Sequence, residues 1–85
     1  MRYSTIFEMA LTEAIAAMPE MAHAMFVMAC LEIGNDPYGQ GGDVAERTAG
    51  GVTKRAWAVS SLGLIEYEVD EEASVITLIS VISLI

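Results

Sequence analysis

The single histidine and the single cysteine are the side chains of this sequence best suited to catalysis or metal binding. His23 has Glu20 three residues before it, so the two could share a helical face, but two ligands do not make a zinc site. Cys30 stands in an apolar run, where a free cysteine is usually buried as a thiol. A Ser-His-Asp catalytic triad or a Cys-His catalytic dyad therefore has little support. We expect no catalytic residue, no metal site, no cofactor and no enzymatic activity.

The glycine-rich segment 35–42 is the next place where spacing could indicate chemistry. Asp36, Asp43 and Glu46 flank it, but they do not follow the alternating oxygen-ligand pattern of a calcium loop. Residues 39–42, Gly-Gln-Gly-Gly, lack the Lys-Ser/Thr pair that completes a phosphate-binding loop. We expect a flexible turn and loop here.

The charge of the chain restricts its partners. Twelve acidic residues and four basic ones give a net charge of −8 and a pI near 4.2. This charge opposes non-specific binding to nucleic acid and to anionic membranes. At 85 residues and 54% hydrophobic composition, the chain is expected to form a single domain, residues 1–85. With no secretory leader pattern and no membrane-length apolar run, a cytoplasmic location is expected.

Apolar spacing predicts two helices in the first half. Residues 5–8, Thr-Ile-Phe-Glu, have the form of a capping box, and apolar residues then recur every three or four positions, which predicts a helix over 5–18. A second helix is predicted from Pro19 to Ile33, with Gly34 ending it. Because this second segment is apolar on nearly all sides, we expect it to be the buried centre of the core.

The second half alternates turn signals with short elements. A capping-box pattern at 43–46 predicts a short helix that ends at Gly50 and Gly51, and Thr53 can cap a further helix over 54–62. Residues 64–69 alternate as a strand, residues 70–73 suit a turn, and the β-branched segment 74–85 predicts a second strand.

This order of elements resembles the winged helix-turn-helix superfamily, over about residues 20–79. Residues 43–56 are similar to its paired helices, and residues 61–66, Ser-Leu-Gly-Leu-Ile-Glu, to the junction between its recognition helix and its wing. The resemblance implies an α+β fold of about four helices plus a C-terminal β-hairpin. It also implies one candidate function, a dimeric DNA-binding transcriptional regulator. The residues that would contact DNA are Arg47, Thr53, Lys54 and Arg55.

The predicted wing is acidic, whereas the wing of DNA-binding members typically carries cations. Its five carboxylates are Glu66, Glu68, Asp70, Glu71 and Glu72. Our leading hypothesis is therefore a non-enzymatic protein-binding module, a small acidic regulator or inhibitor of the phage or mobile-element kind. Its carboxylates would stand in for phosphates on the basic, nucleic-acid-binding surface of a protein partner. Trp57 would be either an aromatic anchor for that partner or a lid over the core.

The C-terminal strand suggests self-association. The first wing strand offers about six partner residues, which would leave the end of the chain without a hairpin mate. An uncovered apolar strand edge invites pairing with another chain. Val81, Ile82, Leu84 and Ile85 could therefore join two copies into a homodimer, unless a segment such as residues 2–6 covers them within the chain.

Overall fold

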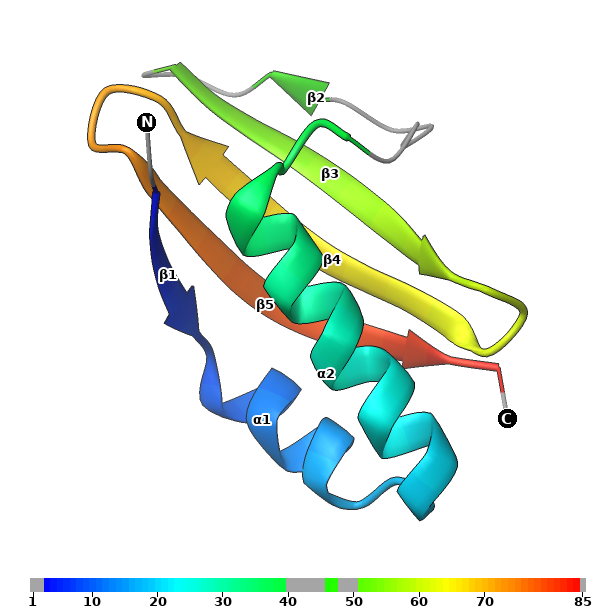
Figure 1. Ribbon diagram of the computed structural model, residues 1–85. Helices are drawn as coiled ribbons and strands as arrows, with labels where there is room; N and C mark the ends of the chain where they lie inside the picture. Colours follow the sequence, from blue (N-terminus) through cyan, green and yellow to red (C-terminus); the bar gives the residue numbers. More distant parts are fainter. Residues whose placement is uncertain (1–2, 40–45, 48–50, 85) are drawn as a thin grey trace.

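The computed structural model describes residues 3–39, 46–47 and 51–84. Two helices follow one N-terminal strand, and the rest of the described chain is strand and turn (Figure 1). The elements are β1 (Ser4–Phe7), α1 (Met9–Ala16), α2 (Glu20–Asn35), β2 (Glu46–Arg47), β3 (Val52–Val59), β4 (Gly63–Asp70) and β5 (Val75–Ser83).

The strands form one sheet in the order β1-β5-β4-β3-β2. β3, β4 and β5 are joined by short turns and pair antiparallel, as consecutive strands usually do. β1 pairs parallel with the first half of β5, from Ser4 opposite Val75 to Phe7 opposite Leu78. β2 pairs antiparallel with β3 at Thr53 and Lys54. The first strand and the last strand of the chain thus lie side by side (Figure 1).

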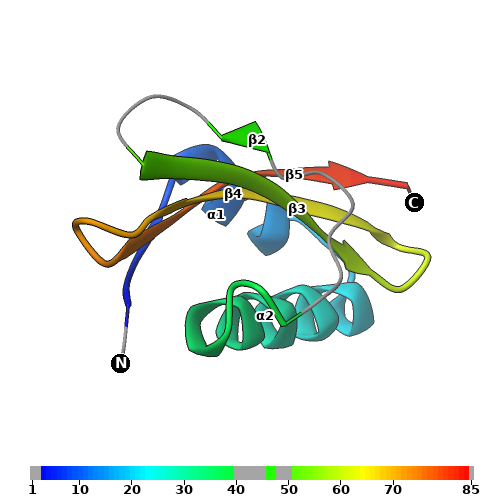
Figure 2. The ribbon, with the colours of Figure 1, turned by 90° about the horizontal axis from the view of Figure 1, so that it is seen from above.

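α2 lies along one face of the sheet (Figure 2), and α1 contacts β5 and α2. α2 buries the residues that recur at three- and four-residue spacing on one side, while the central strands bury alternate residues. The side chains that are buried most completely come from both layers. They are Leu11, Phe26, Ile33, Ile65, Tyr67, Val69, Ile76 and Leu78.

The winged-helix prediction is wrong. Residues 54–62, predicted as a recognition helix, form most of β3 and the turn to β4, so the described chain has two helices rather than about four. Of the predicted helix at 43–50, only Glu46 and Arg47 are described, and they form β2; residues 43–45 and 48–50 lie outside the described residues. The C-terminal strands are two members of a five-stranded sheet and not an isolated hairpin.

Tertiary pairing explains the error in β3. Alternation places Arg55, Trp57 and Val59 on the core side of β3, and alanines occupy positions 56 and 58 between them. Alanine favours helices and hides the polar-apolar alternation of a strand, so local propensity pointed to a helix. In the structure, β4 is buried at four alternate positions and pairs with β5 on one side and β3 on the other. This pairing makes the β3 segment a strand.

The first helix begins later than predicted for a similar reason. Thr5, expected to cap that helix, lies in β1 opposite Ile76, and α1 begins at Met9 without a side-chain cap. The predictions for α2, β4 and β5 are confirmed to within a few residues at each end.

Candidate protein-binding surface

The outward side of α2 is an apolar surface. Among the polar residues of this helix are Glu20, His23 and Glu32, so apolar side chains remain after its inner face is filled. They point outward, with Met21 78% exposed and Met28 61% exposed. We call this the α2 apolar surface: Met21, Met25, Val27, Met28 and Leu31. The expectation that α2 is buried on nearly all sides was wrong, because the sheet covers one side of it.

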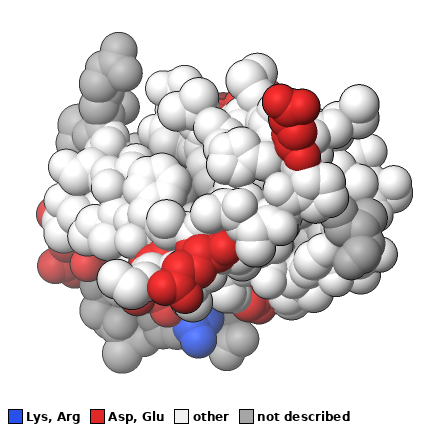
Figure 3. Space-filling model, turned by 90° about the horizontal axis from the view of Figure 1, so that it is seen from below, with Lys and Arg blue, Asp and Glu red and all other residues white. Residues whose placement is uncertain are grey.

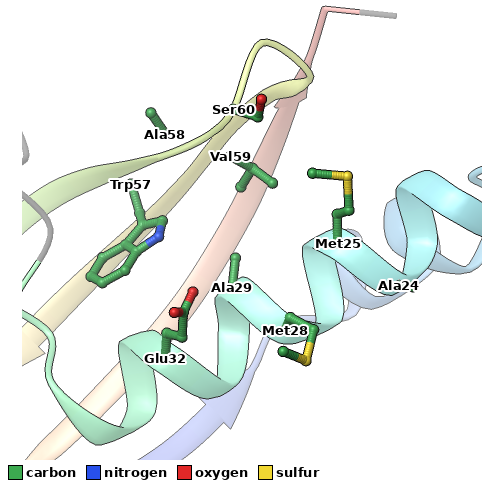
Figure 4. A pocket seen from close by; sticks show the side chains of 9 residues that line it. All are labelled: Ala24, Met25, Met28, Ala29, Glu32, Trp57, Ala58, Val59 and Ser60. Carbon is green, nitrogen blue, oxygen red and sulfur yellow. The ribbon is translucent and has the colours of Figure 1, made fainter.

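A groove of about 470 Å³ runs between α2 and β3. Figure 4 shows Trp57 and Val59 pointing from β3 toward α2, and the Glu32 side chain pointing from α2 toward the sheet. We call it the α2–β3 groove. Its lining residues are Ala24, Met25, Met28, Ala29 and Glu32 from the helix, and Trp57, Ala58, Val59 and Ser60 from β3 and the following turn.

A smaller groove, of about 240 Å³, lies between α1 and α2 and is almost entirely apolar. Buried Leu11, Ile15 and Cys30 contribute to it, as do the exposed Val27 and Leu31. Figure 3 shows that the face carrying α1 and the start of α2 is largely free of charged side chains, with the acidic ones in separate patches. The two grooves therefore flank α2 and extend its apolar surface on both sides.

His23 serves the helix pair. Its Nδ1 donates a hydrogen bond to the carbonyl oxygen of Ile15, 2.9 Å away, because a carbonyl can only accept. This bond ties the start of α2 to the end of α1. In the part of the chain that the structure describes, no three His, Cys, Asp or Glu side chains gather as metal ligands. No helix among those same residues is long and apolar enough to cross a membrane.

Cys30 lies on the buried face of α2, and burial raises the pKa of its thiol from an ordinary 9.0 to about 11. At pH 9 about 1% of the thiol is then ionised in the folded chain, against about half in the unfolded chain. We expect iodoacetamide at pH 9 to label Cys30 at least ~50-fold more slowly in buffer than in concentrated urea. Mass spectrometry of timed samples measures both rates, and equal rates would show an accessible thiolate.

The raised pKa of Cys30 also makes the stability of the fold depend on pH. A folded-state pKa above the unfolded value stabilises the fold below pH 9, and this contribution is lost as the pH rises toward 11.

The five predicted wing carboxylates are divided by the fold. Glu66, Glu68 and Asp70 alternate with the buried residues of β4, so they lie on its face away from the core. Ser80 Oγ donates to Glu66 Oε1 at 2.5 Å, and the Ala73 amide donates to Asp70 Oδ1 at 3.1 Å. Glu71 and Glu72 lie in the β4–β5 turn. Three of the five thus form one row, which we call the β4 acidic row.

Glu71 accepts hydrogen bonds from two tyrosines of the same chain. The Tyr3 hydroxyl donates to both of its carboxylate oxygens, at 2.9 and 3.0 Å, and the Tyr38 hydroxyl donates to one of them. Burial, with a further contribution from Glu71, raises the pKa of Tyr38 to about 12. Glu71 therefore links the β4–β5 turn to the residue that precedes β1 and to the segment after α2. The sequence analysis did not predict this role.

The residues expected to contact DNA lie on strands. Thr53 and Lys54 are in β3 and Lys54 is exposed, while Arg47 is in β2. Arg55 is half-buried and contacts other residues of the chain: its Nε donates to the Tyr67 hydroxyl at 3.2 Å, and its guanidinium carbon lies 5.1 Å from the Tyr38 ring centre. The Tyr67 hydroxyl in turn donates to the Pro37 carbonyl oxygen. Among the described residues, these four lie on strands and not on a recognition helix.

Trp57 belongs to both the core and the groove. It is 7% exposed, its ring centre lies 6.5 Å from that of Tyr67, and one side of it lines the α2–β3 groove. The lid and anchor hypotheses for this residue are therefore compatible.

The end of the chain has the hairpin mate that it was expected to lack. Val81 pairs with Ile65 and Ile82 with Leu64, because the register of β4 and β5 shifts between Glu66 and Tyr67. The Leu84 amide also donates to the Leu62 carbonyl oxygen, at 2.8 Å. Ile85 lies outside the described residues. The segment at residues 2–6 does not cover this end, since β1 pairs with β5 only from Val75 to Leu78. A homodimer through the second half of β5 stays a prediction.

Comparisons with known proteins place the fold. No family model matches the chain, and no curated protein sequence is similar to it. A chain of the archaeal RelE–RelB complex from Pyrococcus horikoshii OT3 superposes with a TM-score of 0.81 at 14% identity, over 98% of this chain and 96% of that one. A chain of the toxin–antitoxin complex RelBE2 from Mycobacterium tuberculosis gives 0.71 at 15% identity, over 98% and 99%.

At these identities the likeness shows a shared fold. It overturns the suspected membership of the winged helix-turn-helix superfamily, since both neighbours come from toxin–antitoxin or RelE–RelB complexes and superpose along nearly the whole chain.

Proposed function

We propose that this chain is a non-enzymatic protein-binding module that regulates or inhibits a partner protein within a two-protein complex. The observation that carries the proposal is the α2 apolar surface with a groove on each side. Large apolar patches on small proteins mark interaction sites, and methionine-rich ones adapt to a partner's shape. The fold neighbours support it, because both were solved as complexes with a protein partner.

The absence of catalysis is part of the proposal. His23 and Cys30 are the candidate base and nucleophile of the sequence. His23 is hydrogen-bonded to Ile15, and the thiol of Cys30 is buried, with its pKa raised to about 11. Neither is poised to transfer a proton to a substrate.

The partner is proposed to carry a basic surface. The net charge of −8 and the β4 acidic row favour association with a cationic protein through steering and charge complementarity. In the narrower form of this hypothesis, the row masks a nucleic-acid-binding surface of the partner, with carboxylates in place of phosphates.

The test is a quantitative pull-down from the cells that encode the chain, with a matched pair of variants. Met28→Glu puts a charge into the α2–β3 groove, whereas Met9→Glu puts the same charge on another exposed methionine, which lies outside both grooves. We expect a partner that is retained by the wild type and by Met9→Glu, and at least ~10-fold less by Met28→Glu, because charge is poorly tolerated at a desolvated anchor. Retention of no protein by the wild type, or equal retention by both variants, would contradict the proposal.

A further inference from the structure

We infer that the α2–β3 groove receives a short amphipathic helix of the protein partner, with apolar side chains facing the groove and a basic side chain beside Glu32. This inference deepens the proposed function and depends on it.

The length and lining of the groove fit a helix. The lining residues of α2 run from Ala24 to Glu32, about two turns or ~12 Å of helix. Ala24 and Ala29 are small and let another backbone approach, while Met25 and Met28 can adapt to the side chains of the occupant. An amphipathic helix offers apolar anchors at three- and four-residue spacing, which matches this length.

One end of the α2–β3 groove carries a negative charge. Of the nine lining residues only Glu32 is charged. It lies in the last turn of α2, where the helix dipole adds partial negative charge, and no basic residue lies in that turn. Figure 4 shows the carboxylate at the Trp57 end of the groove. A lysine or arginine of the occupant would be stabilised there and an acidic side chain repelled.

The same charge argues against a second copy as occupant. Two copies would each bring a net charge of −8 and one Glu32 to the shared contact. Like charges placed together oppose association, whereas a basic segment of another protein is attracted. The occupant is therefore assigned to a different, basic chain.

The experiment uses the folded full chain and synthetic 14-residue helical peptides. The first peptide carries leucines at i, i+3, i+4 and i+7 and an arginine at one end, the second has glutamate in place of that arginine, and the third has a central proline. Trp57 is the only tryptophan, so its fluorescence reports occupancy of the groove directly. Titrations are run on the wild type, on Glu32→Gln and on Glu13→Gln, an exposed carboxylate of α1 outside the groove.

We expect the arginine peptide to bind more tightly than the glutamate peptide, and the proline peptide to bind least. Glu32→Gln should weaken the arginine peptide by about two- to fivefold, as expected for one partly exposed ion pair, and Glu13→Gln should leave its affinity unchanged. Failure of the arginine peptide to bind, tighter binding of the proline peptide, or equal effects of the two variants would overturn the inference.

Two outcomes separate this inference from the proposed function. A partner captured through Met28 while the arginine peptide does not bind would leave the proposed function standing and reject this occupant. A wild-type homodimer in sedimentation that Met28→Glu dissociates would assign the groove to a second copy instead.

Discussion

Gly63→Ala is expected to destabilise the fold by about 3 kcal/mol and to lower its melting temperature by about 12–24 °C. A Cβ added at Gly63 would lie 2.3 Å from the carbonyl oxygen of Ile82 and 3.2 Å from Phe26 Cζ. The first atom is backbone of the neighbouring strand, so relief requires β4 and β5 to separate where they pair. Chains of this length have about 4–13 kcal/mol of stability in total, so the loss is a large part of it.

Urea denaturation followed by circular dichroism measures this effect. Ser61→Ala, in the exposed turn two residues before Gly63, is the matched control and should change the free energy of unfolding by less than ~0.5 kcal/mol. A loss below ~1 kcal/mol for Gly63→Ala would show that the two strands do not approach so closely at this end of the sheet.

Sequence reasoning succeeded where local pattern and tertiary environment agree. α2 was predicted from Pro19 to Ile33 and runs from Glu20 to Asn35, because its inner face keeps helical spacing over about three turns. β4 was predicted from its alternation, which also places Glu66 and Glu68 on the face away from the core. The existence of these elements follows from side-chain periodicity alone.

The sheet topology could not be predicted in this way. The parallel pairing of β1 with β5 joins the two ends of the chain, and β3 is a strand because β4 needs a second neighbour. Both depend on contacts distant in sequence, whereas the capping and turn residues around these segments suit helices equally well. The resemblance to a winged helix arose from that ambiguity between Gly51 and Gly63.

The candidate site was predicted only in part. Trp57 and the carboxylates of β4 were identified from residue type, but the α2–β3 groove exists only because α2 packs beside β3. The bonds of Glu71 to Tyr3 and Tyr38 span 68 and 33 residues, so no local spacing could have indicated them. The apolar surface of α2 was noticed in the sequence and assigned to the core, since nothing local shows which side of a helix a single sheet will cover.

The two candidate contact surfaces have opposite character and lie on different faces. The α2 apolar surface and its grooves lie on the helical side of the sheet, and the β4 acidic row points away from the core. Apolar burial supplies most of the affinity in protein complexes, while charge mainly sets the rate and selectivity of encounter. A partner that contacts both faces would bind mainly through the α2 apolar surface, and the β4 acidic row would guide its approach.

Trp57→Ala is expected to cost about 3–5 kcal/mol of folding free energy, because it removes the largest side chain shared by the core and the α2–β3 groove. The indole is 7% exposed and packs near Tyr67, so its loss leaves a cavity between α2 and the sheet. Circular dichroism in urea measures the change without relying on tryptophan fluorescence. Against a total of about 4–13 kcal/mol, this loss is a large part of the stability of the fold.

Trp57→Phe separates the structural role from the binding role. Phenylalanine keeps most of the buried ring, so the free energy of unfolding should fall by less than ~1.5 kcal/mol. If Trp57 is also an anchor, the same variant should bind the partner at least ~10-fold more weakly, since aromatic anchors depend on their full contact area. Unchanged binding by a stable Trp57→Phe would restrict the residue to the core. A Trp57→Ala chain as stable as the wild type would show that the fold does not depend on the indole.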